Sequence, residues 1–315
     1  MRHPRMAYAS TSVLHINKHP MNTQSYSKGV LFVVLAGVFL SSGGLLVRFV
    51  DQASPWTILF YRSLVFTVTV ALFLWVRDRH SFKQQFLKIK AIDLLVSLLL
   101  ATGFICYLLS LFNTTVANTV LLLSTGPVVA GVLAYYFLGE PLKAINWAAM
   151  TLAIAGVCVM VSGGVNANDI TGILFALGAV VAFAFFVVLL RYLGPQRDMM
   201  APTALAGLIA AIMCIPMLLP LIDNLAISGR DLLVAICLGS AQVGCGFIFI
   251  TLGSKSVPAA QIPLLGLSET ALSPVWVWLA VNEVPANNTL IGGGIVLLAV
   301  LMQGYAGLKE QTSVD

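Results

Sequence analysis

Two ionisable side chains, Arg62 and Glu269, lie deep inside long apolar stretches of this sequence. A charge in the hydrocarbon core of a bilayer costs about 2.5–3.5 kcal/mol on insertion scales, so such residues are rare and usually functional. Arg62 follows Pro55 by seven residues, which puts it roughly 10 Å from the start of a helix. Glu269 lies roughly 18 Å from the end of its own apolar stretch, near the middle of a membrane.

These two side chains could do three kinds of chemistry. They could pair with each other and hold two parts of the fold together. They could line a wet cavity, where Arg62 binds the carboxylate and Glu269 the ammonium of an amino-acid-like solute. Glu269 could also carry a proton that is coupled to transport, with Arg62 modulating it. A fourth possibility is that Arg62 simply reaches the nearer membrane surface.

Amide side chains in the same apolar stretches are candidates for the wall of a cavity. Amides are costlier in lipid than hydroxyls, so we expect Asn118, Gln242 and Gln261 to face polar surroundings. The alternative is that they join helices by hydrogen bonds across an interface. The polar residues gather in the first, third, fourth, eighth and ninth apolar stretches, so we expect those stretches to line the cavity.

Three further residues could touch a solute, namely Ser42, Tyr107 and Trp278. The rings of Tyr107 and Trp278 could stack on an aromatic or cationic group, although packing against lipid is the alternative for each. Three residues could bend helices, namely Gly126, Pro127 and Pro274. Interrupted helices at matching positions mark binding sites and hinges in transporters, whereas static kinks are the alternative.

Other chemistry has little support in the sequence. The four histidines lie outside the apolar stretches, and the five cysteines form no CxxC motif. There is neither an HExxH motif nor a GxxxxGK[ST] loop for nucleotides. We therefore predict no catalytic residue, no metal site and no cofactor.

The elements that must position these residues are membrane-spanning helices. The 315 residues are 59% hydrophobic and only 9% charged, against about 25% charged in soluble proteins. This composition argues against a soluble enzyme, a nucleic-acid-binding protein and a disordered scaffold. A span needs about 20 apolar residues, and ten segments qualify: 29–50, 55–76, 92–112, 116–138, 145–163, 170–190, 202–222, 232–252, 259–281 and 289–306.

The positive charges predict how these spans are oriented. If residues 1–28 form a cytoplasmic N-terminal tail, fourteen Lys and Arg residues lie inside and only Arg48 and Arg230 outside. We therefore expect both termini to be cytoplasmic, with a short C-terminal tail at 307–315. Arg48 and Asp93 lie at span ends, where we expect them to reach the lipid headgroups.

The spans divide into two halves of five, residues 29–163 and 170–306. An odd number of spans per half means that the second half enters the membrane inverted, an architecture common in transporters. A shift of 143 residues places Glu140 on Glu283 and Asn118 on Gln261. The predicted fold class is all-α integral membrane, with ten transmembrane helices as two inverted five-helix repeats around a central cavity.

Three short sequences carry a family resemblance: Phe60-Tyr61-Arg62-Ser63, Gly126-Pro127-Val128-Val129-Ala130 and Leu138-Gly139-Glu140-Pro141. With ten spans in two halves, the chain resembles the EamA-type branch of the drug/metabolite transporter superfamily. Many members have Pro directly after the acidic residue of the ninth span, whereas this chain has Thr270 there and Pro274 later. The resemblance implies a basket of ten helices and a small-molecule permease, most often an exporter of amino acids or other metabolites.

The predicted function is therefore a secondary transporter, and not an enzyme. It would move a small, amino-acid-like or related amphipathic metabolite across the inner (cell) membrane by alternating access, as an exporter that could be proton-coupled. The alternatives are an integral-membrane enzyme acting on a lipid substrate, a passive channel and a non-transporting sensor. The expected partners are a small-molecule substrate, the lipid bilayer and protons, with no nucleic acid, in a monomer or homodimer.

Overall fold

The computed structural model describes residues 23–139, 144–162, 167–193, 197–220, 227–253, 256 and 267–312. Within these ranges every regular element is a helix, and no residue forms a strand. The elements in chain order are α1 (Thr23–Arg48), α2 (Pro55–Arg77), α3 (Phe82–Leu87), α4 (Ala91–Asn113), α5 (Val116–Leu123), α6 (Gly126–Leu138), α7 (Ala144–Val161), α8 (Ala167–Leu193), α9 (Met200–Leu218), α10 (Gly229–Cys237), η2 (Leu238–Cys245), α11 (Gly246–Gly253), α13 (Leu267–Val281) and α14 (Asn287–Thr312).

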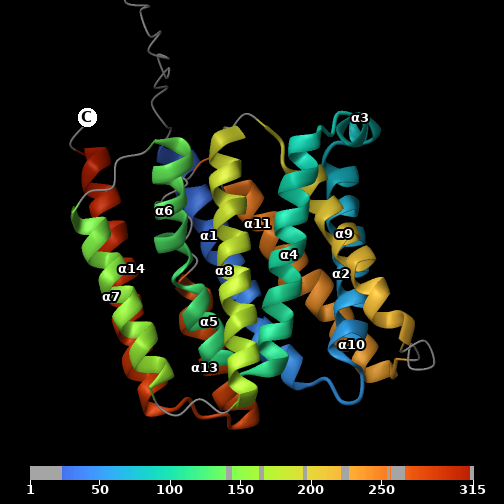
Figure 1. The fold of residues 1–315 in the computed structure, drawn as a ribbon. Coiled ribbons are helices and arrows are strands. Elements are labelled where there is room, and N and C mark those ends of the chain that lie inside the picture. Colours follow the sequence, from blue (N-terminus) through green and yellow to red (C-terminus); the bar gives the residue numbers. More distant parts are fainter. Residues whose placement is uncertain are drawn as a thin grey trace, which may run out of the picture.

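The long helices lie side by side with their axes in roughly one direction (Figure 1). In the part of the chain that is described, seven stretches are long and apolar enough to cross a membrane: Ser27–Arg48, Pro55–Arg77, Ala91–Asn113, Val116–Leu138, Asp169–Leu190, Met200–Leu218 and Gly229–Gly253. Shorter apolar helices occur at Trp147–Gly156, Leu272–Val281 and Leu290–Ala299, within the predicted fifth, ninth and tenth spans. The first part of the predicted ninth span, 259–266, lies outside the described residues.

Polar residues start several helices by accepting hydrogen bonds from free backbone N–H groups. The Ser54 hydroxyl accepts from the N–H of Thr57 at 3.1 Å, directly before Pro55 in the first turn of α2. The Thr115 hydroxyl does the same for α5 and the Ser228 hydroxyl for α10. These caps end the connections between spans and fix where each helix begins.

The predicted fourth span is interrupted, because α5 ends at Leu123 and α6 begins at Gly126. The proline at the next position cannot donate a backbone hydrogen bond. Two hydroxyls lie at the break: Ser124 donates to the carbonyl of Leu121 at 2.6 Å and Thr125 to the carbonyl of Leu122 at 2.7 Å. Pro274, by contrast, lies inside α13 without ending it.

The predicted eighth span contains a feature that the sequence did not indicate. It consists of α10, the π-helical segment η2 and α11, which follow one another without a loop. A π-helical turn is wider than an α-helical turn, and it is often found at functional sites. The short helix α3, between the second and third spans, was also not predicted.

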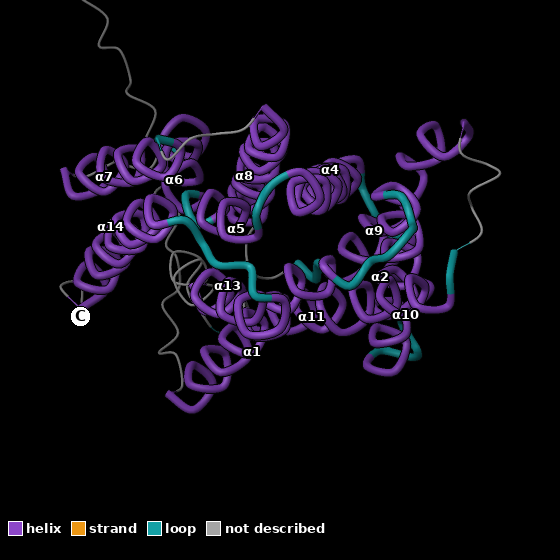
Figure 2. Tube along the Cα trace, turned by 90° about the horizontal axis from the view of Figure 1, so that it is seen from below, coloured by secondary structure: helices purple, strands orange, loops and turns teal. Residues whose placement is uncertain are grey.

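Packing joins helices that are far apart in the sequence. α2 packs against α9, α4 against α8, α7 against α14, and α1 against α11 and α13. α7 and α14 lie at one edge of the bundle, while α2, α9 and α10 lie at the other (Figure 2). Two clusters of buried apolar residues draw most of their members from α2, α4, α9 and the eighth span; one includes Ile58 and Leu108 and the other Phe66 and Leu100.

Candidate functional site

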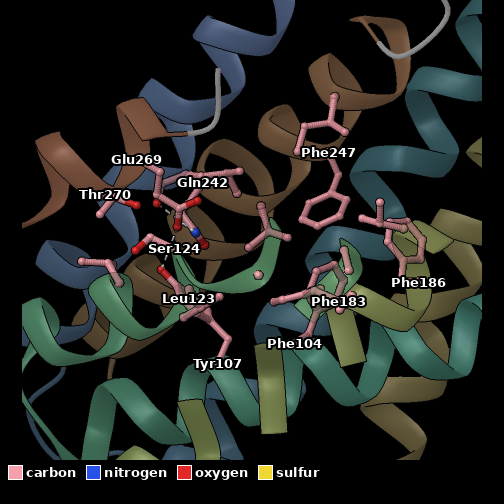
Figure 3. A pocket seen from close by; sticks show the side chains of 18 of the residues that line it. Phe104, Tyr107, Leu123, Ser124, Phe183, Phe186, Gln242, Phe247, Glu269 and Thr270 are labelled. Atoms are coloured by element: carbon pink, nitrogen blue, oxygen red, sulfur yellow. Dashed lines mark hydrogen bonds between the residues drawn. The ribbon is translucent and has the colours of Figure 1, made fainter. Parts of the chain in front are cut away.

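A cavity of about 240 Å³ lies between the helices near the centre of the bundle. Its described lining comes from α1, α2, α4, α5, α6, α8, η2, α11 and α13, whereas α7, α9 and α14 contribute none of the described lining residues. Polar and aromatic side chains occupy different parts of its wall (Figure 3). The cavity therefore has a polar part and an apolar part, which are described in turn.

The polar part of the cavity is formed by Tyr107, Gln242 and Glu269 (Figure 3), and Arg62 also lines the cavity. The hydroxyl of Tyr107 donates to Oε1 of Glu269 at 3.5 Å, a long hydrogen bond. The Nε2 of Gln242 donates to the backbone carbonyl of Leu40 at 3.2 Å. Three elements, α4, η2 and α13, thus each bring one polar side chain to the same part of the wall, and α2 contributes Arg62 beside the Phe104 ring.

Arg62 is the most unusual of these residues, because it is only 2% exposed yet poorly paired. Its Nε and Nη1 have no hydrogen-bond partner among the described residues. The guanidinium lies 5.5 Å from the centre of the Phe104 ring, a cation–π distance. Buried guanidinium groups normally have a carboxylate or several acceptors, so the two unpaired nitrogens favour a ligand with an anionic group.

Arg62 and Glu269 do not form an ion pair in the described structure, although both line the same cavity. The hypothesis that they pair to hold the halves together is therefore not supported by this arrangement. Both remain available for the other chemistry considered above, in which each binds a different group of a solute.

The apolar part of the cavity is formed largely by phenylalanines. Phe104 lies edge-on to Phe247 with ring centres 4.9 Å apart and edge-on to Phe183 at 6.3 Å. Phe186 also lines the wall. Rings in such edge-to-face arrangements make a rigid apolar surface that suits an aromatic or large aliphatic group.

Close helix approach sets the position of Arg62. A Cβ on Gly239 of η2 would lie 2.5 Å from the backbone carbonyl of Arg62 and 2.7 Å from the Cβ of Val65. Only glycine therefore allows the π-helical segment to pack this tightly on α2, which carries the guanidinium into the wall.

The structure brings only some of the other predicted site residues to the cavity. Gly126 lines it, but Ser42, Asn118 and Trp278 are not among its described lining residues. The Ser42 hydroxyl donates to the carbonyl of Phe39, and the Asn118 amide donates to the hydroxyl of Thr114. Trp278 is 52% exposed.

Two predicted site residues cannot be placed. Gln261 and the side chain of Pro127 lie outside the described residues. Three lining residues, Phe104, Phe183 and Phe186, were not predicted, because nothing in their spacing distinguishes them among 17 phenylalanines. The contribution of α8 was not predicted either, because its apolar sequence gives no sign of a cavity.

The two ends of the bundle carry different ion pairs. At the end where α1 finishes, here called the Arg48 end, Arg48 Nε binds Glu283 Oε2 at 2.7 Å. Arg48 also donates to the carbonyls of Leu111 at 2.8 Å and Thr114 at 3.1 Å, and Glu283 Oε1 accepts from the N–H of Val116 at 3.2 Å. The expectation that Arg48 extends to the headgroups was wrong, because its donors are used by protein acceptors.

The opposite end, here called the Arg77 end, has two ion pairs involving the segment that leads into α9. Arg77 pairs with Asp198 and with its neighbour Asp78. Arg197 binds Asp93 at 2.6 Å, and the same carboxylate oxygen accepts from the N–H of Lys90 at 2.8 Å. Asp93 is buried and paired, so the expectation that it reaches the headgroups was also wrong.

Comparison with known proteins gives consistent results. A model described as the EamA-like transporter family matches residues 27–162 and 170–304. An uncharacterized transporter, YwfM of Bacillus subtilis (strain 168), is 25% identical over 292 residues, covering 90% of this chain and 96% of that protein. A solved crystal structure aligns with a TM-score of 0.68 at 16% identity, over 88% of this chain and 97% of that one.

Proposed function

The chain belongs to the EamA-like transporter family, and on that premise we propose that it carries a zwitterionic, amino-acid-like solute with a large apolar side chain. It is a multi-pass membrane protein, given its family and its apolar helices. The observation that carries the substrate proposal is the buried Arg62 guanidinium, which belongs to a residue that lines the cavity and has two nitrogens without a hydrogen-bond partner among the described residues.

A carboxylate is the group that best satisfies Arg62. A guanidinium offers parallel N–H donors that match the two oxygens of a carboxylate. Glu269 lines the same cavity and carries a carboxylate itself, so it suits the ammonium of the same solute. Arg62 and Glu269 thereby divide the two charges of an α-amino acid between them.

The phenylalanines that line the cavity indicate which kind of side chain the solute carries. Phe104, Phe183 and Phe247 form an apolar surface beside the charged groups. The cavity of about 240 Å³ lies below the roughly 300–1,000 Å³ of pockets for drug-sized ligands. A single amino acid with an aromatic or large aliphatic side chain fits this size and polarity better than a peptide does.

The packing pattern supports alternating access by two inverted halves. If α1–α7 correspond in order to α8–α14, then the contact of α4 with α8 has its counterpart in the contact of α11 with α1. The contact of α6 with α8 likewise matches that of α13 with α1, while α2–α9 and α7–α14 join corresponding helices. Ten spans related in this way would enclose the cavity between the halves and let them rock about it.

The proposal also covers the direction of transport and the ion to which transport is coupled. The excess of Lys and Arg at the Arg77 end favours a cytoplasmic location for that end and for both termini. We propose export across the cell membrane, coupled to inward movement of a proton on Glu269. A proton and a solute ammonium would compete for the same carboxylate, which is the requirement for antiport.

The test is counterflow of radiolabelled phenylalanine in proteoliposomes. We expect uptake with the intact protein, and a loss of about tenfold or more with Arg62→Ala, because an unpaired carboxylate would then be buried. Arg79→Ala is the matched control, since Arg79 lies over the Trp75 ring away from the cavity. An equal loss for neutral solutes would indicate that Arg62 has only a structural role.

A pH gradient across the same vesicles tests the proton. Phenylalanine should accumulate against its gradient with the intact protein, and Glu269→Gln should abolish this accumulation. If Glu269→Gln transports at the parent rate when driven by the pH gradient, Glu269 does not couple transport to protons.

A further inference from the structure

We propose that Gln242 is a specificity-determining residue, which selects a solute nitrogen that still carries several N–H groups, and that Gly43 and the π-helical segment η2 position it. The inference rests on the proposed function, because it concerns how the ammonium end of the solute is recognised.

The two polar atoms of the Gln242 amide have different surroundings. Its Nε2 donates to the carbonyl of Leu40 at 3.2 Å, so the orientation of the amide is fixed by this bond. Its Oε1 has no hydrogen-bond partner among the described residues, although the side chain is only 1% exposed and lines the cavity. A buried amide oxygen without a donor is costly. A solute whose N–H group donates to this oxygen should therefore bind in strong preference to a solute that lacks such a group.

Gly43 of α1 creates the space that the amide occupies. A Cβ at this position would lie 2.8 Å from Nε2 of Gln242 and 2.9 Å from the hydroxyl oxygen of Tyr107. Both groups therefore lie against the same point on α1, and Tyr107 in turn donates to Glu269. Gln242, Tyr107 and Glu269 thus form one polar cluster, visible in Figure 3, and any side chain at Gly43 would displace Gln242 and Tyr107.

The π-helical segment determines which way Gln242 points. Gln242 lies within η2 (Leu238–Cys245), between two α-helical segments of the same span. An extra residue in a helical turn rotates the later residues by about 100° relative to a continuous α-helix. Gln242 would therefore point in a different direction if the span were α-helical throughout.

The chemistry of the ammonium group makes this arrangement selective. A primary ammonium has three N–H donors, so Glu269 can accept from one while Gln242 Oε1 accepts from another. An N,N-dimethyl ammonium keeps its charge but has only one N–H donor. It can satisfy Glu269 or Gln242, but not both, so its charge alone does not replace the missing bond.

Competition in counterflow tests this selectivity. Phenylalanine, N-methylphenylalanine and N,N-dimethylphenylalanine are compared as competitors of radiolabelled phenylalanine. With the intact protein we expect phenylalanine to compete about tenfold better than the dimethyl compound. Gln242→Met keeps the length of the side chain but removes the acceptor, so the preference should fall to about twofold.

Gly43→Ala tests the positioning role. Gly43→Ala should lose the preference for phenylalanine over the dimethyl compound, as Gln242→Met does. The double variant should be no less selective than either single variant, because both substitutions remove the same interaction. Gly294→Ala is the matched control, since a Cβ there meets no atom within 4 Å. Thermal unfolding in detergent shows whether each variant is folded, and Gln242→Met decides the question alone if Gly43→Ala is not.

The two proposals fail in different ways. If the intact protein transports phenylalanine and Gln242→Met retains the tenfold preference, the role of Gln242 is wrong and the proposed function stands. If the intact protein binds and transports none of the three compounds, the substrate class is wrong and the role of Gln242 falls with it.

Discussion

At the Arg48 end, one ion pair joins parts of the chain that line the cavity to each other. At the Arg77 end, the described ion pairs instead join such helices to a segment away from the cavity. Arg48 of α1 and Glu283, after α13, are also bonded to the end of α4 and the start of α5. α1, α4, α5 and α13 all contribute to the cavity wall. The Arg77 and Arg197 pairs instead connect α2 and α4 to the segment before α9, which contributes no described lining residue.

This difference means that the ion pairs at the two ends should respond differently when the helices of the cavity wall separate. A bond between two helices of the cavity wall must break if those helices separate to open that end. A bond from a wall helix to an outer helix can persist through the same movement. If the two halves move by alternating access, as proposed, we expect the ion pair at the Arg48 end to favour the closed state of that end and the pairs at the Arg77 end to stabilise the fold.

The largest effect should come from Glu283→Gln. The substitution keeps an oxygen that accepts from the N–H of Val116 but removes the charge that pairs with Arg48. Weakening the closed state by about 1.4 kcal/mol would raise the open population about tenfold. We expect a cysteine at Ala130, in a variant without the five native cysteines, to react about tenfold faster with a membrane-impermeant maleimide added at the Arg48 side.

The matched control for Glu283→Gln is Arg48→Lys, which keeps the positive charge but lacks the fork of donors that reaches both carbonyls. An intermediate rate is expected for it. An unchanged rate with Glu283→Gln would show that this end is closed by packing alone.

A smaller effect of a different kind is expected for Asp198→Asn. The substitution removes a partner of Arg77 at the other end, while Asp78 remains. These side chains are 21% and 33% exposed, so the loss should be only about 1 kcal/mol. Thermal unfolding in detergent should shift down by about 2–4 °C, with no change in maleimide rate at the Ala130 position. A faster rate would remove the distinction between the two ends.

The smallest effect is expected for Ser54→Ala, which removes the N-cap of α2 at the Arg48 end. The expected loss of stability is about 0.5 kcal/mol, at the low end for such caps, because Pro55 already fixes the backbone of the first helical turn. The maleimide rate should stay at the parent value. If this variant also reacts faster, general destabilisation of the Arg48 end, and not the ion pair, controls access.

The family was predicted from the sequence and is confirmed by the match over both halves, and the all-helical character was predicted too. Four of the predicted site residues line one cavity in the structure: Arg62, Tyr107, Gln242 and Glu269. These could be found because a polar group inside an apolar stretch is costly wherever it lies. That cost depends on the local sequence alone.

The missing features depend on tertiary contacts. The partner of Arg48 is 235 residues away, and nothing near Arg48 in the sequence identifies it. Asn118 looked like a cavity residue because its amide lies in an apolar stretch, but Thr114 four residues earlier accepts its hydrogen bond. The π-helical segment could not be predicted either, since its residues are compatible with a continuous α-helix.

The interruption between α5 and α6 has a consequence for how the cavity wall can change shape. Lipid offers no hydrogen bonds, so a membrane helix normally cannot bend without exposing carbonyl groups at a high energetic cost. Here Ser124 and Thr125 supply hydroxyl donors from the bend itself, and these donors move together with the backbone they satisfy. We therefore propose that the two pieces of this span tilt relative to each other while keeping both of these hydrogen bonds.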